Sequence, residues 1–223
     1  MDIQNKNRKL LKKNHVYDET MEHDACGVGL VASTEGLKSR KVVEYGIEAL
    51  KAVWHRGAID ADGKTGDGAG IHIEIPNDFF AEKIEITGHE HDNSDLCVGM
   101  IFLPRNDFGG QEQCRSIVES ELTKKNFNIY GWRQVPVDPS VLGEKAEQTR
   151  PEITQVLFTH NDKSIHGKDL ERALYETRRK IEKEALRNQL NNFYICSFSS
   201  KSIIYKGMFL AESLSDFYPD LKD

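Results

Sequence analysis

The sequence predicts an α+β fold with antiparallel strand pairing, and three observations lead to this class. Strand-like apolar runs come in groups, helical runs fall between them irregularly, and no segment is repeated. A doubly wound parallel sheet would instead require regular alternation of strands and helices. The chain has 223 residues, which is enough to bury a substantial core in one domain or at most two small ones.

Composition excludes several classes of protein. Hydrophobic residues make up 38% of the chain and charged residues 30%, which is typical of a globular protein rather than a disordered one. The net charge of −6 argues against a nucleic-acid partner, because nucleic-acid-binding proteins usually present a basic face. No apolar run approaches eighteen residues, so we expect no membrane-spanning helix and no membrane partner.

The N-terminal region and the cysteines predict the cellular compartment. The basic start of the chain surrounds only one apolar pair, Leu10 and Leu11, so it lacks the apolar stretch of a secretory signal. The cysteines have no C-x-x-C spacing, which disfavours a metal or iron–sulfur framework and a disulfide scaffold: Cys26, Cys97, Cys114 and Cys196. We therefore expect reduced thiols and a cytoplasmic location. Residues 1–25 are predicted to be a polar tail, with order beginning at Cys26.

Hydrophobic periodicity predicts the elements of the first half in order. The small apolar run 27–32 favours a buried strand. Ser39 can cap a helix whose apolar positions recur three and four residues apart as far as Trp54. A loop rich in glycine and aspartate, a strand, a short helix and a second strand are expected next: 55–68, 69–75, 78–83 and 96–103.

The second half is predicted in the same way. We expect a helix, two strands, a long helix and a hairpin: 110–125, 129–137, 153–158, 167–189, and 193–198 with 202–206. The long helix places one apolar stripe toward the core: Leu170, Leu174, Thr177, Ile181 and Ala185. On its solvated face, Glu176 and Lys180 have the spacing of an ion pair.

Three weaker motifs lack the structural context that their chemistry requires. Residues 27–32 match G-x-G-x-x-A, but a polar tail precedes the motif and a predicted strand runs through it. Residues 63–65 resemble the end of a P-loop, but Ala58 stands where the first glycine should be and glycines follow instead of a helix. The run 89–92 contains two histidines without metal-ligand spacing. Nucleotide binding by the Lys64 loop is therefore the weakest function considered, and the loop is interpreted as a tight turn near a functional site.

Cys26 is the candidate nucleophile because of its position in the chain. A lone cysteine at the start of a strand is usually a small buried hydrophobe. If residues 1–25 were removed, however, Cys26 would carry both a thiol and a free α-amine, whose reference pKa is about 7.7–8.0. That amine can accept the thiol proton and later donate a proton to a leaving amide nitrogen. The adjacent Gly27 would leave room for a substrate.

The same residues resemble the N-terminal part of the large subunit of the glutamate synthase family. The resemblance covers nearly all of the chain after residue 22 and is carried by five segments: Asp24–Gly29, His55–Ala58, Asp62–Gly70, Arg133–Val137 and Tyr205–Met208. Amidophosphoribosyltransferase and glucosamine-6-phosphate synthase share the Cys–Gly start but lack the run from Asp62 to Gly70. The loop therefore favours glutamate synthase over these relatives.

The resemblance implies a class II glutamine amidotransferase domain over 26–223, with an N-terminal-nucleophile hydrolase fold. That fold is a four-layer αββα sandwich, expected here to be incomplete at its C-terminus. In the family a propeptide, Met1–Ala25 in this chain, is removed and the exposed cysteine attacks the side-chain amide of L-glutamine. A thioester forms, ammonia leaves and water releases glutamate. By this resemblance Cys26 is catalytic, while Arg56 and Gly27 support the active-site loop.

The resemblance also implies partners outside this chain. In the whole enzyme, ammonia passes to synthase domains that contain FMN and an iron–sulfur cluster, and reductive synthesis from 2-oxoglutarate yields a second glutamate. The electron donor stays open between NADPH, NADH and ferredoxin, so a small reductase subunit or ferredoxin is the expected redox partner. No cofactor is expected to bind this chain itself.

Two family segments, S-R-F-S-T-N-T and N-G-E-x-N, do not occur in the sequence. By the resemblance they would supply the arginine for the substrate carboxylate and the oxyanion hole. An oxyanion-hole donor is commonly worth about 10²–10³ in rate, so we expect a partial domain that is nearly inactive alone. The alternative is a non-catalytic interaction module that retains the fold.

Overall fold

The computed structural model describes residues 6–7, 9–10, 26–54, 57–90 and 95–222, and they form an α+β structure with two antiparallel sheets. The first sheet has four strands in the order β3-β4-β2-β5: Phe127–Gln134, Glu152–His160, Leu96–Leu103 and Tyr194–Ser199. The second sheet pairs β1 (Ala69–Glu74) with β6 (Ser202–Gly207). The predicted fold class and antiparallel pairing are confirmed.

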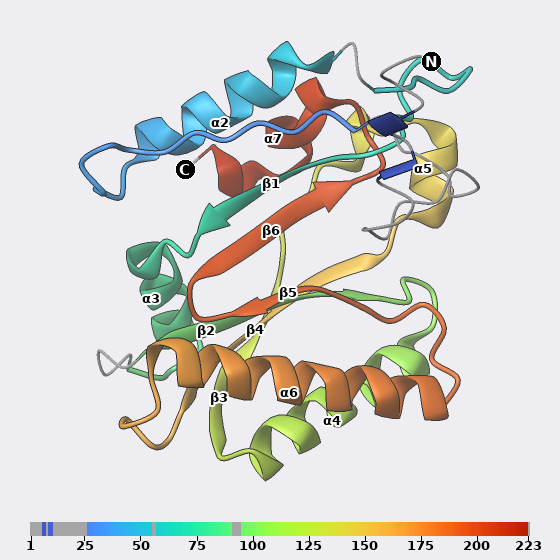
Figure 1. The fold of residues 1–223 in the computed structure, drawn as a ribbon. Helices are drawn as coiled ribbons and strands as arrows, with labels where there is room; N and C mark the ends of the chain where they lie inside the picture. Colours follow the sequence, from blue (N-terminus) through green and yellow to red (C-terminus); the bar gives the residue numbers. More distant parts are fainter. Residues whose placement is uncertain (1–5, 8, 11–25, 55–56, 91–94, 223) are drawn as a thin grey trace.

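Helices cover the outer side of each sheet (Figure 1). The long helices α4 (Phe108–Lys124) and α6 (Gly167–Arg187) pack on the four-stranded sheet, where they enclose one apolar cluster. A second apolar cluster fills the space between the sheets and extends to α2 (Arg40–Ala52) and α7 (Leu214–Phe217). The described residues are therefore arranged as helices, sheet, sheet and helices.

Strand β2 shows why a continuous apolar run correctly predicts a buried strand. Seven of its eight residues are buried, because one face meets α4 and α6 and the other faces the second sheet. Cys97 and Ile101 belong to the outer cluster, whereas Val98 and Met100 belong to the cluster between the sheets. A strand buried on both faces has no need of polar alternation.

The predicted helices agree closely with the structure. Ser39 caps α2, with its Oγ accepting a hydrogen bond from the backbone N–H of Lys41 at 3.2 Å. All five residues of the predicted stripe on α6 are buried. The short helix α3 extends further than predicted, over Asn77–Ile86. The sequence did not predict α5 (Glu144–Thr149), because this helix buries only Ala146 and so has no apolar period. Three 3₁₀ turns were not predicted either: Pro139–Val141, Ala211–Ser213 and Pro219–Leu221.

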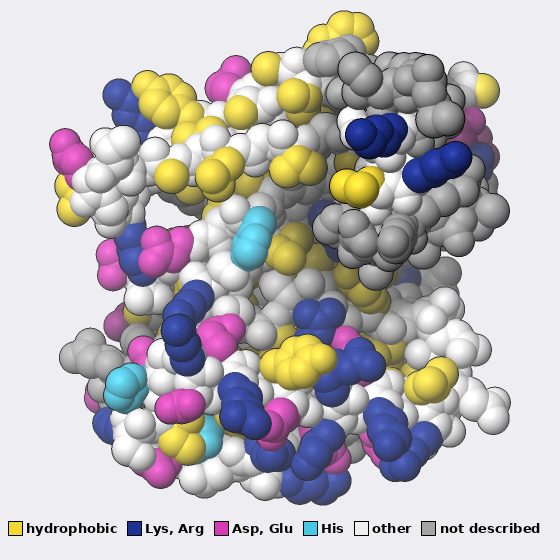
Figure 2. All heavy atoms as spheres, viewed as in Figure 1, with side chains coloured by type: hydrophobic (Ala, Val, Ile, Leu, Met, Phe, Trp, Pro, Cys, Tyr) yellow, Lys and Arg dark blue, Asp and Glu magenta, His cyan; other side chains and the backbone are white. Residues whose placement is uncertain are grey.

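The strand predicted at 27–32 is wrong. These residues have no regular secondary structure, and no described strand pairs with them. Val28 and Leu30 are 90% and 91% exposed, so the small apolar run is not part of the core. Trp54, placed on the inward stripe of the first helix by its spacing, is also largely exposed. Figure 2 shows hydrophobic side chains gathered over α2 and the segment that precedes it.

The predicted hairpin is also wrong in its pairing. Strands β5 and β6 follow each other directly, but β5 pairs with β2 and β6 pairs with β1, so the turn carries the chain from one sheet to the other. The carboxylate of Glu171 holds this turn by accepting hydrogen bonds from the hydroxyls of Ser199 and Ser200 at 3.0 and 2.7 Å.

The ion pair expected between Glu176 and Lys180 is replaced by others. Glu176 instead contacts Lys125 on the neighbouring segment, at 3.3 Å, and Arg172 one turn earlier, at 3.5 Å. The long-range partner competes with the local one because α4 and α6 pack side by side.

A buried polar network links the two sheets. Arg133 on β3 forms a bidentate ion pair with Asp220, with both N–O distances at 2.7 Å, and also donates to Gln155 Oε1 on β4 at 2.9 Å. Gln155 in turn lies 3.3 Å from the hydroxyl of Tyr205 on β6. Charge-assisted bidentate bonds are strong and directional, so this network sets how the C-terminal turn and the two sheets meet.

No helix in the described ranges is long and apolar enough to cross a bilayer.

Candidate active site

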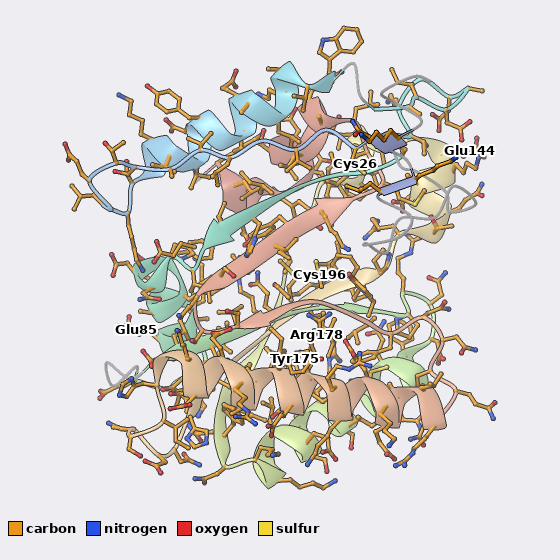
Figure 3. All side chains as sticks on the ribbon, viewed as in Figure 1. Cys26, Glu85, Glu144, Tyr175, Arg178 and Cys196 are labelled. Carbon is orange, nitrogen blue, oxygen red and sulfur yellow. The ribbon has the colours of Figure 1, made fainter. Side chains whose placement is uncertain are left out.

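A cleft of about 2160 Å³ is lined by residues from both sheets, and Cys26 and Gly27 lie on its wall. Figure 3 shows Cys26 near the paired ends of β1 and β6, where Ala69 is opposite Gly207. Ligand pockets usually measure roughly 300–1,000 Å³, so the shape of this cleft alone does not select a ligand. Its chemistry must come from the side chains along its wall.

Cys26 differs from the other cysteines in its exposure. Its side chain is exposed, whereas Cys97, Cys114 and Cys196 are buried. Burial raises the pKa of the Cys114 and Cys196 thiols to about 11, and that of Cys97 further still. Since the thiolate is the nucleophile, these three thiols are unreactive at neutral pH. Cys26 is thus the one cysteine that both reaches solvent and lines the cleft.

The remaining predicted site residues are only partly placed. Gly27 lines the cleft beside Cys26, as does Gly57, the neighbour of Arg56. Arg56 itself lies outside the described residues, and so does the junction between Ala25 and Cys26. The structure therefore places Cys26, Gly27 and Gly57 on the wall of one cleft. The supporting role of Arg56 stays a prediction.

The described part of the glycine- and aspartate-rich loop makes a tight turn, as predicted, and the structure shows that this turn closes a hairpin. Ile59 pairs with Gly66 in an isolated bridge, and Gly63 adopts φ +70°, a conformation that favours glycine. The Asp62 carboxylate accepts hydrogen bonds from the hydroxyl of Thr65 at 2.5 Å and from its backbone N–H at 2.7 Å. These bonds, the hydroxyl bond most of all, lower the pKa of Asp62 to about 2.

The surroundings of Lys64 do not form a phosphate cradle. The chain passes from the hairpin into β1 instead of starting a helix after Thr65. A P-loop depends on a helix N-terminus aimed at the phosphate, so the nucleotide hypothesis loses its structural basis at this loop.

Two polar residues of the cleft, Lys206 and Tyr194, were given no role by the sequence patterns. Lys206 on β6 donates a hydrogen bond to the hydroxyl of Tyr194 on β5 at 2.7 Å, which joins the two sheets within the cleft. Lys206 lies in a segment that carried the family resemblance, but its spacing indicated no partner. Tyr194 had no sequence signal, because only the crossing from one sheet to the other brings it near Lys206.

The motif at 89–92 is only partly described. His89 Nδ1 lies 3.1 Å from the hydroxyl of Thr87, whereas His91 and Asp92 are outside the described residues. Across the described ranges, no three His, Cys, Asp or Glu side chains gather to form a candidate metal site.

Comparison with known proteins identifies the family. The family model described as glutamine amidotransferases class-II matches residues 26–223, so the chain belongs to this family. The matched region begins at Cys26, the residue whose exposed thiol lines the cleft. The predicted class of enzyme is therefore confirmed.

Within that family, the chain is similar to glutamate synthases. It is 54% identical over 217 residues to the glutamate synthase [NADPH] large chain of Azospirillum brasilense, a match that covers 97% of this chain and 14% of that protein. It is 38% identical over 203 residues to ferredoxin-dependent glutamate synthase 2 of Synechocystis sp., covering 91% of this chain and 13% of that protein. It is 37% identical over 211 residues to the chloroplastic ferredoxin-dependent glutamate synthase 2 of Arabidopsis thaliana, a match that covers 94% of this chain and 13% of that protein.

These matches confirm the predicted resemblance: the chain is an amidotransferase domain of the glutamate synthase type. It spans about a seventh of the length of the curated relatives that it matches.

Proposed function

We propose that this chain supplies the glutaminase activity of a glutamate synthase, releasing ammonia from L-glutamine through a thioester on Cys26. One observation carries the proposal. Of four cysteines, only Cys26 combines an exposed thiol with a place on the cleft wall, and the family match begins at that residue. The other three thiols are buried and held in their protonated form.

The chemistry follows from a cysteine at a chain terminus. Once residues 1–25 are removed, the α-amine of Cys26 accepts the thiol proton and Sγ attacks the side-chain amide carbon of glutamine. The C–N bond breaks, the proton passes to nitrogen and ammonia leaves. Water then attacks the thioester carbon, and glutamate and the free thiol are released. Gly27 leaves space beside the sulfur, and Arg56 supports the active-site loop.

The proposed fold is an N-terminal-nucleophile hydrolase sandwich. Its support is the arrangement of two antiparallel sheets with helices on both outer sides (Figure 1). The segments that supply the substrate carboxylate ligand and the oxyanion hole in this family do not occur in this sequence. The chain alone should therefore turn over glutamine very slowly.

In the complete protein, ammonia would be delivered to synthase domains that carry FMN and an iron–sulfur cluster. Neither cofactor is assigned to residues of this chain. The identity of 54% to an NADPH-type large chain, against 37–39% to ferredoxin-dependent relatives, supports NADPH as the electron donor, with a small reductase subunit as partner. We also propose a cytoplasmic location.

The test is Cys26→Ala in the complete protein that contains this chain. We expect glutamine-dependent glutamate synthesis to disappear while synthesis from added ammonia persists, because the variant removes only the nucleophile. Cys196→Ala is the matched control, since its thiol is buried, and it should keep the glutamine-dependent reaction. N-terminal sequencing of the wild type should begin at Cys26.

A thiol-alkylating glutamine analogue gives a second readout, independent of turnover. Peptide mapping should place the label on Cys26. A label on any other residue, or glutamine-dependent activity in Cys26→Ala, would exclude the assigned nucleophile. If no residue is labelled and the N-terminus is uncut, the alternative of a non-catalytic interaction module is favoured. The exposed Val28 and Leu30 would then belong to its binding surface.

A further inference from the structure

We propose that Asp62, Thr65 and Gly143 form a pin that positions the cleft wall beside Cys26. The proposal rests on the glutaminase function proposed above and assigns positioning residues to it. The hairpin 57–68 contributes to the cleft only through its two ends: Gly57, Ala58, Ile59, Asp67 and Gly68. Its tip, 60–65, does not line the cleft and faces another part of the molecule.

The inner part of the pin is the bond between Asp62 and Thr65. Thr65 is only 2% exposed, so its hydroxyl has little access to water and its bond to the Asp62 carboxylate satisfies it. A buried hydroxyl left without a partner is costly, which makes this bond a requirement of the folded loop. The backbone N–H of Asp60 also donates to the carbonyl of Thr65 at 2.9 Å, closing the tip.

The outer part of the pin is Gly143, which precedes α5 and is 78 residues from Thr65 in the chain. Its φ of −75° and ψ of 160° are accessible to any residue, so backbone conformation does not require glycine here. The lack of space requires glycine at this position. A Cβ at Gly143 would lie 2.6 Å from the Thr65 nitrogen and closer still to Asp62 Oδ2 and Thr65 Oγ1. The tip therefore rests directly on the backbone of Gly143.

Two further contacts hold the hairpin on either side of this pin. The Asp60 carboxylate pairs with Lys145 of α5 at 2.6 Å. On the other side, a Cβ at Gly66 would lie 2.6 Å from the carbonyl oxygen of Phe209, so the hairpin also lies against the segment that follows β6. The hairpin therefore contacts α5 on one side and the segment after β6 on the other.

The geometry connects the pin to the chemistry. The bridge between Ile59 and Gly66 joins the clasped tip to the residues that line the cleft. A displacement at the tip would pass to Gly57–Ile59 and Asp67–Gly68 and would change the wall of the cleft that Cys26 also lines. A misplacement of about 1 Å far from the reacting atoms can reduce rates about 10²-fold.

The principal test is Gly143→Ala in the complete protein. The added methyl group must push the tip outward, because the atoms that it meets are backbone and a hydrogen-bonded pair. We expect kcat/KM for glutamine to fall about 10- to 100-fold, mainly through kcat, and alkylation of Cys26 by the glutamine analogue to slow in parallel. Synthesis from added ammonia should be unchanged. Gly109→Ala is the matched control, because its Cβ would have only one neighbour, at 3.6 Å, and it should behave as wild type.

A second pair of variants keeps the proposal testable if Gly143→Ala does not fold. Thr65→Val removes the hydroxyl but keeps the volume, and it should reduce glutamine-dependent kcat, whereas Thr65→Ser should restore it. If Gly143→Ala and Thr65→Val both retain wild-type kcat/KM for glutamine, the pin has no positioning role. Equal loss of the ammonia-dependent reaction would likewise overturn it, since that result indicates general damage. If wild type itself releases no ammonia from glutamine, the proposed function fails instead.

Discussion

The four-stranded sheet and the two-stranded sheet differ in how completely they are covered. In β2 seven of eight residues are buried, whereas β1 alternates between half-buried and exposed positions and has no fully buried residue. The segment before α2 leaves Val28 and Leu30 about nine-tenths exposed. The closed half, meaning the four-stranded sheet with α4 and α6, encloses one of the two apolar clusters. The open half, meaning the two-stranded sheet with the segment before α2, carries Cys26 on the wall of the cleft. Burial is therefore uneven in this molecule, and the proposed nucleophile lies in its more exposed half.

The largest effect should come from breaking the ion pair that joins the halves. Arg133 and Asp220 are 15% and 5% exposed, so Asp220→Ala would leave a largely buried guanidinium without its carboxylate partner. Removing one member of a buried pair costs about 3–5 kcal/mol, and we expect a loss of that order in the unfolding free energy, measured by urea titration. Asp216→Ala is the control, because its pair with Lys222 is more than half exposed and should be worth about 0–1 kcal/mol. Similar losses in both variants would show that the two sheets are not joined through Asp220.

The next effect tests the closed half. Leu174 on α6 is fully buried against the four-stranded sheet, and Leu174→Ala should cost about 2–5 kcal/mol through lost burial and a cavity. Leu186 lies on the same helix but is 73% exposed, so Leu186→Ala should stay within about 0.5 kcal/mol of wild type. Thermal or urea unfolding of both variants measures the difference. If Leu174→Ala lowers the unfolding free energy by less than about 1 kcal/mol, the tight packing of α6 on the four-stranded sheet is contradicted.

The smallest effect tests the open half. Val28→Ser should change the unfolding free energy by no more than about 0.5 kcal/mol, because the side chain has almost no contacts to lose. It should, however, reduce binding of a hydrophobic dye, since it removes apolar surface. Val98→Ser, in the buried strand β2, is the matched comparison and should be strongly destabilising. A loss above about 1 kcal/mol for Val28→Ser would mean that this segment packs against the fold.

The sequence by itself determined the elements whose burial repeats locally. The stripe on α6 and the continuous apolar run of β2 are visible in the chain, because a regular period reports which side chains leave water. The cap at Ser39 and the tight turn with Gly63 were equally predictable, since their bonds and backbone angles involve near neighbours. The candidate nucleophile, Cys26, also came from chemistry written in the sequence.

Only the tertiary structure decided which elements meet. An apolar run such as 27–32 looks the same with or without a partner strand, and two consecutive strands look like a hairpin whether or not they share a sheet. The contact of Thr65 with Gly143 and the bond between Lys206 and Tyr194 join residues that no local period relates. Strand pairing and close approach depend on long-range packing, which a local pattern does not record.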